Sequence, residues 1–123
     1  METKSFKELL MWQKSHAFVL AVYKITDKFP QTEKFGLVSQ FRRAAGSIPA
    51  NIAEGYRRRG KADKLRFFNI SQGSLEECRY YIVLSFDLKF INEQEQNNLD
   101  SLIEDASKLL NMYCVKLSAD SNS

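Results

Sequence analysis

Apolar residues recur every three or four positions along almost the whole chain. Because an α-helix has 3.6 residues per turn, this spacing gathers the apolar side chains along one side of a helix. No segment alternates between apolar and polar residues over the length of a strand, and only five glycines and two prolines are present to form turns. The sequence therefore predicts an all-α fold.

Four segments show this helical spacing, and short polar stretches separate them. The first covers residues 9–29 and stops at Pro30, after which Thr32 is the expected N-cap of the second. The third covers residues 62–90, and the polar turn "INEQEQ" separates it from the fourth. Long helices joined by short turns favour an antiparallel, up-and-down four-helix bundle. We expect a single domain over residues 1–123, with a frayed tail from about residue 118 to residue 123.

The second segment contains the stretch "AAGSIPANIAEG", which places poor helix formers inside a helix. Its apolar positions keep their three-four spacing across Pro49: Val38, Phe41, Ala45, Ile48, Ile52 and Gly55. We therefore predict a continuous helix that is kinked at Pro49. An interior proline costs about 3 kcal/mol and an interior glycine about 1 kcal/mol, so packing has to compensate.

Two interpretations of this stretch stay open from the residues alone. In the first, the small residues let a neighbouring helix approach closely, and Ser47 hydrogen-bonds a backbone group freed at the bend. In the second, Asn51 and Glu54 lie one turn apart and form a buried or interfacial hydrogen-bonded site. A catalytic Glu54 lacks a second group to complete an acid-base pair.

The third segment has apolar residues on two sides, which indicates a central helix or one shared with another subunit.

Positive charge is concentrated in one part of the chain. Residues 42–66 contain eight basic and two acidic residues, a local net charge of +6, whereas the whole chain carries +3. The basic residues are Arg42, Arg43, Arg57, Arg58, Arg59, Lys61, Lys64 and Arg66. Guanidinium groups match phosphate oxygens, so these residues are candidate nucleic-acid contacts. Tyr56 and Phe67 are either stacking surfaces for unpaired bases or aromatic residues of the core or an interface.

The sequence argues against an enzyme, and we expect no cofactor and no metal. His16 is the only histidine, and Cys78 and Cys114 do not have the spacing of a zinc site. No phosphate-binding loop or nucleophile elbow occurs. Charged residues interrupt the N-terminal stretch, so neither a signal peptide nor a membrane span is expected. These features predict a cytoplasmic protein with free thiols.

Several motifs resemble one known family. "FGLVSQFRRAAGSIPANIAEGYRR" and "GSLEE" at residues 73–77 are similar to the 23S ribosomal-RNA intervening-sequence proteins, as are Trp12, "VYKIT" from Val22, and "FP" at residues 29–30. The likeness covers roughly residues 12–110. Its specific centre, "SIPANIAEG", includes the structural-motif positions Ser47, Ile48, Pro49, Asn51, Glu54 and Gly55.

The resemblance implies a four-helix bundle that assembles as a ring-shaped homopentamer. It also implies kinship with accessory variability proteins of retroelement reverse transcriptases, in which a basic pentameric surface contacts nucleic acid and the polymerase. We therefore predict a non-enzymatic, oligomeric nucleic-acid-binding protein, with RNA as the expected ligand and charge or shape as the basis of recognition. The alternative is a homo-oligomeric scaffold that docks a protein partner and binds no nucleic acid.

Overall fold

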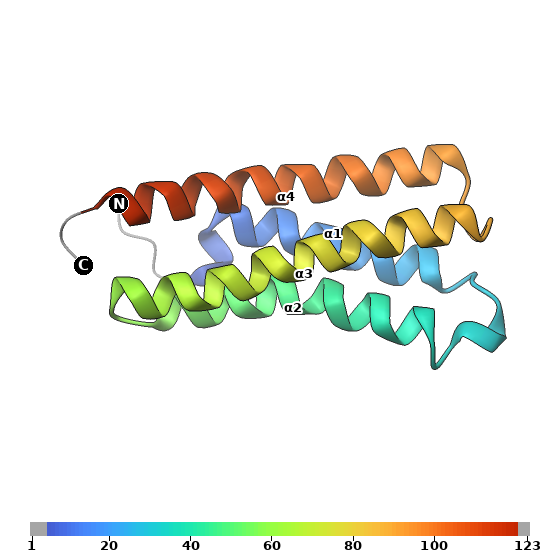
Figure 1. Cartoon of the computed structure of the whole chain (residues 1–123), viewed down its shortest axis with the longest axis horizontal. Coiled ribbons are helices and arrows are strands. Elements are labelled where there is room, and N and C mark those ends of the chain that lie inside the picture. The colour runs from blue at the N-terminus through green and yellow to red at the C-terminus, as the bar shows by residue number, and fades with distance from the viewer. Residues whose placement is uncertain (1–4, 121–123) are drawn as a thin grey trace.

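The computed structural model describes residues 5–120, which form four α-helices and no strand (Figure 1). The helices are α1 (Leu10–Thr26), α2 (Leu37–Arg57), α3 (Lys61–Asp87) and α4 (Glu93–Ala119). Short 3₁₀ helices at Phe6–Glu8 and Gln31–Glu33 precede α1 and α2. The prediction of an all-α fold is confirmed.

The helices run alternately in opposite directions, and each packs against the next one in the chain (Figure 1). α4 also packs against α1, which closes the bundle. Within residues 5–120 no Cα atoms approach within 8 Å between α1 and α3, or between α2 and α4, across the diagonals. The result is the antiparallel, up-and-down four-helix bundle that the spacing predicted. The start of α1, the α2–α3 connection and the end of α4 lie at one end of it (Figure 1).

The core confirms the predicted seam of α2. All six of its apolar positions are buried: Val38, Phe41, Ala45, Ile48, Ile52 and Gly55. In α1 the spacing predicts an apolar face of Trp12, Val19, Val22, Ile25, Thr26 and Phe29. Val22, Thr26 and Phe29 are buried as predicted, whereas Trp12, Val19 and Ile25 are only half-buried at the edge of the core, and Met11, Ser15 and Phe18 are buried in addition. The apolar pattern alone therefore placed the face of α1 slightly off its true position.

α2 passes through Pro49 without interruption, as predicted, and the bend at Pro49 stays a prediction. α2 and α3 make the most extensive contact in the bundle, and two features bring them together. The Ser71 hydroxyl donates a buried hydrogen bond to the Ile48 carbonyl at 2.8 Å. Gly55 faces the ring of Phe68 so closely that a side chain at this position would collide with the ring. Gly55 thus has a packing role, which supports the first interpretation.

A small hydrogen-bonded group joins the same two helices. The Ser47 hydroxyl accepts hydrogen bonds from the Ser74 hydroxyl at 2.9 Å and the Asn51 amide at 3.0 Å. The Asn51 amide also donates to the Ser47 carbonyl at 2.9 Å. The Ser47 hydroxyl thus accepts from two side chains and, within residues 5–120, does not bond a backbone group freed at Pro49, which corrects the expectation for Ser47. The hydroxyl that bonds a backbone carbonyl of α2 is that of Ser71 in α3. Asn51 does belong to a hydrogen-bonded site, at the junction of the two helices.

Three helix ends differ from the sequence expectation. Thr32 lies in the second 3₁₀ helix and does not cap α2; Gly36 occupies the N-cap position, and the Glu33 carboxylate accepts from the Leu37 amide at 3.2 Å. "INEQEQ" is not all turn, because Asn92 caps α4, which begins at the next residue. α4 also runs through Ala119, so the first two residues of the predicted frayed tail are helical. Residues 121–123 of that tail lie outside the described residues.

Candidate nucleic-acid interface

The bundle divides the predicted basic cluster into two groups. Arg42 and Arg43 lie near the start of α2, whereas the other six basic residues lie around the α2–α3 connection at the opposite end (Figure 1). Fourteen positions separate Arg43 from Arg57. At 1.5 Å per residue these positions span about 21 Å of helix. We call the group formed by Arg57, Arg58, Arg59, Lys61, Lys64 and Arg66 the basic end.

Arg42 and Arg43 have partners within the bundle. The Arg42 guanidinium donates to the Thr26 hydroxyl at 2.9 Å and to the Tyr23 carbonyl at 3.2 Å, and it lies 4.6 Å from the centre of the Tyr23 ring. It therefore satisfies backbone and side-chain acceptors at the end of α1. Arg43 forms an ion pair with Glu77 of α3. Both residues therefore have partners on other helices, and their role as nucleic-acid contacts stays a prediction.

Two lysines of the basic end are also committed to the bundle. The Lys64 ammonium donates to the carbonyls of Tyr56 at 2.8 Å and Gly55 at 3.2 Å, and so satisfies acceptors in the last turn of α2. Burial lowers the pKa of Lys64 from its ordinary value. The Lys61 ammonium donates to the backbone carbonyl of Asp120, beyond the end of α4. These lysines fasten α3 to the helices on either side of it.

Two arginines of the basic end cover an aromatic ring. The guanidinium groups of Arg58 and Arg66 each lie 4.5 Å from the centre of the Phe67 ring. Arg58 also pairs with Glu54 at 2.9 Å, and Arg66 pairs with Asp63 at 3.0 Å. Ion pairs and cation-π contacts therefore hold both guanidinium groups at the surface of the bundle. Glu54 acts here as a partner for Arg58.

The remaining arginines, Arg57 and Arg59, are exposed, and their side chains have no hydrogen bond, ion pair or ring contact within residues 5–120. Together with Arg58 and Gly60 they line an open depression of about 470 Å³. Glu54 and Asp63 also line it, and Arg58 lies within 4.0 Å of both carboxylates. The two free guanidinium groups are therefore the strongest unsatisfied donors at this end of the bundle.

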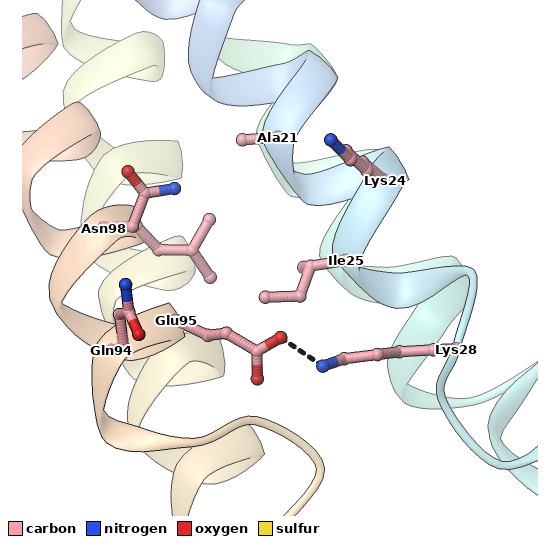
Figure 2. Close-up of a pocket in the computed structure, with 8 residues that line it drawn as sticks. Ala21, Lys24, Ile25, Lys28, Gln94, Glu95 and Asn98 are labelled. Carbon is pink, nitrogen blue, oxygen red and sulfur yellow. Dashed lines mark hydrogen bonds and ion pairs between the residues drawn. The ribbon is translucent and has the colours of Figure 1, made fainter.

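A second hollow lies between α1 and α4 and has a different character (Figure 2). It has a volume of about 390 Å³ and is lined by Ala21, Lys24, Ile25, Lys28, Gln94, Glu95, Asn98 and Leu99. Figure 2 shows the ion pair between Lys28 and Glu95, which bridges the two sides of the hollow. The hydrogen bond from Lys28, together with one from the Asn92 amide, lowers the pKa of Glu95. Its lining includes no histidine, cysteine or hydroxyl side chain.

Sequence reasoning missed this hollow because its two sides come from residues about seventy positions apart.

Elsewhere, His16 stacks on Trp12 with the ring centres 4.9 Å apart. Within the described part of the chain, no group of three or more histidine, cysteine, aspartate or glutamate residues is arranged to hold a metal ion. No helix there is long and apolar enough to cross a membrane.

The two sequence motifs meet at the junction of α2 and α3. Ser47, in "SIPANIAEG", bonds to Ser74, in "GSLEE", and Glu77 of the same motif pairs with Arg43. The family model described as 23S rRNA-intervening sequence protein matches residues 7–112, which include this junction. The chain belongs to this family. Residues of both motifs therefore contribute contacts between α2 and α3 in this member of the 23S rRNA-intervening sequence family.

A solved structure supports the fold. The chain is similar to a protein of unknown function from the S23 ribosomal protein family of Bacteroides thetaiotaomicron VPI-5482, with a TM-score of 0.80 and 22% sequence identity. The match covers 86% of this chain and 96% of that protein. At this identity the likeness establishes the fold alone. Comparison with curated proteins found no match.

Proposed function

We propose that this protein binds RNA without catalysing a reaction, and that its basic end contacts the phosphates. The observation that carries the proposal is the exposure of Arg57 and Arg59 with no partner in the described structure. A guanidinium group donates two parallel hydrogen bonds to phosphate oxygens, and neutralised phosphates release counterions. Arg58 directly precedes Arg59, and Lys61 follows it after Gly60. Both residues add to the local positive potential.

Two free arginines per chain make a weak site, so the proposal includes assembly of several copies. Linked copies bind one ligand far more tightly than a single copy does, because later contacts become intramolecular. We propose a homo-oligomer, and the resemblance to the family favours a pentamer. We propose no membrane as a partner.

The outer surface of α2 and α3 supports assembly. On α2, Gly46, Ala50 and Ala53 follow at spacings of four and three, and each is exposed or half-buried. A Cβ atom at Gly46, or at Gly73 of α3, would meet nothing within 4 Å. Each interior glycine costs a helix about 1 kcal/mol relative to alanine, and no contact in the described structure compensates for that cost here. Close approach of a helix from a second copy would do so.

A filter-binding titration with structured RNA tests the binding. The double variant Arg57→Glu and Arg59→Glu should lower the affinity at least about tenfold, because it reverses both free charges. The matched control is Lys24→Glu with Lys108→Glu, which makes the same change of charge on exposed lysines away from the basic end. Equal losses in both variants, or no retention of RNA by the wild-type protein at low salt, would contradict the proposal.

Light scattering of the purified protein tests the assembly. A mass of five chains is expected, and a monomer would overturn the oligomer. The second candidate function, a protein-interaction scaffold, is favoured by exposed apolar side chains such as Phe35, which is 87% exposed. An oligomer that retains no RNA at low salt would select the scaffold.

A further inference from the structure

We infer that the basic end binds double-stranded segments through their phosphate backbone and does not bind unpaired bases. This inference rests on the proposed function and narrows its ligand. It follows from what the aromatic rings and the cations of the basic end already contact.

The Phe67 ring is not free to stack on a base. The guanidinium groups of Arg58 and Arg66 each lie 4.5 Å from its centre, and each is also held by a carboxylate, Glu54 for Arg58 and Asp63 for Arg66. A base would have to displace a guanidinium group from the ring and from its ion pair together. The ring therefore organises the arginines and offers no open platform.

Two other aromatic side chains near the basic end, Tyr56 and Tyr113, are also occupied. Tyr56 is half-buried, and the Lys64 ammonium that lies 5.8 Å from its ring centre is held by the carbonyls of the last turn of α2. Tyr113 packs edge-on against the buried ring of Phe68, with centres 5.5 Å apart. The exposed ring of Phe35 lies at the α1–α2 connection, the opposite end of the bundle.

Proteins that bind single strands without sequence preference combine cations with open aromatic platforms. The basic end has the cations alone. Its free groups, Arg57 and Arg59, are suited to phosphates, and a duplex offers one phosphate charge per about 1.7 Å of its axis, twice the density of one strand. Between Arg57 and Lys61 the chain has no amide or hydroxyl side chain to read a base edge. The denser phosphate charge of a duplex therefore favours it over a single strand as the ligand.

Fluorescence anisotropy with the full chain tests this inference at about 50 mM and about 200 mM KCl. The probes are a labelled RNA duplex of about 20 base pairs, a DNA duplex of the same sequence, and an unstructured RNA strand of equal length. We expect the RNA duplex to bind about tenfold more tightly than the single strand, and the DNA duplex to bind within about fivefold of the RNA duplex. A 2-aminopurine base in the single strand should keep its fluorescence, because no ring stacks on it.

Phe67→Leu adds a second measurement, with Phe35→Leu as the control that removes an exposed ring at the far end. Both variants should keep the single-strand affinity within about twofold, whereas loss of a stacking platform would lower it about tenfold. Thermal unfolding establishes that each variant is folded. A single strand that binds as tightly as the duplex, or a change in 2-aminopurine fluorescence, overturns the inference and leaves the proposed function standing. Failure of all three probes to bind at the lower salt overturns both.

Discussion

Gly55→Ala should destabilise the bundle even though alanine is the better helix former. Gly55 is buried in the last turns of α2, where it faces Phe68 of α3. A Cβ atom built on Gly55 would lie 2.8 Å from Cδ1 and 3.0 Å from Cζ of the Phe68 ring, and nearer still to Cε1. Ordinary contacts between carbon atoms are about 3.5–4.0 Å, so the ring or the helix must move by roughly 1 Å.

The expected loss combines two opposing effects. Replacing glycine by alanine inside a helix stabilises it by about 1 kcal/mol. Overpacking a filled core costs about 1–3 kcal/mol, and the upper value applies here because Phe68 has no exposed surface into which it can turn. The net effect is a loss of about 2 kcal/mol from the free energy of unfolding.

Urea unfolding followed by circular dichroism measures this loss. With a slope of about 2 kcal/mol per molar, the midpoint should fall by about 1 M urea. Gly46→Ala is the matched control at protein concentrations low enough to dissociate the proposed oligomer, because within one chain a Cβ atom there meets nothing within 4 Å and the helix should gain about 1 kcal/mol. Both variants are measured over a tenfold range of protein concentration, so that any contribution from assembly is visible as a shift of the midpoint.

Opposite shifts of the two midpoints are the result that the packing of α2 on α3 requires. Wild-type or greater stability of Gly55→Ala would refute the close approach of Gly55 to Phe68. A double-mutant cycle with Phe68→Leu adds a direct test of the contact. The smaller leucine leaves room for the new methyl group, so the double variant should be less destabilised than the sum of the two single variants.

Three further predictions concern other parts of the bundle. Arg42→Ala should lower the stability by about 1 kcal/mol through lost hydrogen bonds at the end of α1, and a binding titration should show unchanged RNA affinity. Lys28 holds the pKa of Glu95 below its ordinary value of 4.5, so the stability that Glu95 contributes is present above pH 4.5 and is lost as the pH falls through the lower pKa of the folded state. In Glu95→Gln, the free energy of unfolding from urea titrations should therefore fall less steeply as the pH is lowered through this range. Burial raises the pKa of Cys78 to about 12, so the folded protein should resist thiol reagents at this residue near pH 8 and react after unfolding, which mass spectrometry of the modified protein measures.

Most of the fold could be predicted from the sequence because the apolar spacing carries the helical period. The face of α1 is where the pattern misled, and Ser15 shows why. Ser15 is buried, and its hydroxyl donates to the carbonyl of Met11 at 2.7 Å. A polar residue that satisfies its own hydroxyl within the helix fits the core, yet it breaks an apolar pattern.

The candidate site was predictable only in part. A run of arginines is visible in any sequence, and the spacing of four between Glu54 and Arg58 already suggests their ion pair. The partners of Arg42 on α1 have no such local signal, because they depend on which helices become neighbours. Charge counted along a chain therefore overstates the charge that is free to meet a ligand.

This difference between total and free charge has a measurable consequence. The logarithm of the binding constant falls against the logarithm of the salt concentration with a slope of about −0.9 for each phosphate neutralised on a duplex. Two free arginines predict a slope of about −1.8 for one chain and about −9 for five chains that contact one ligand together. Arg59→Ala should remove about half of the slope, whereas Arg43→Ala should leave it unchanged because Arg43 is paired with Glu77. An equal reduction by both variants would show that the paired arginines also reach the phosphates, and the separation of the two basic groups would then have no bearing on binding.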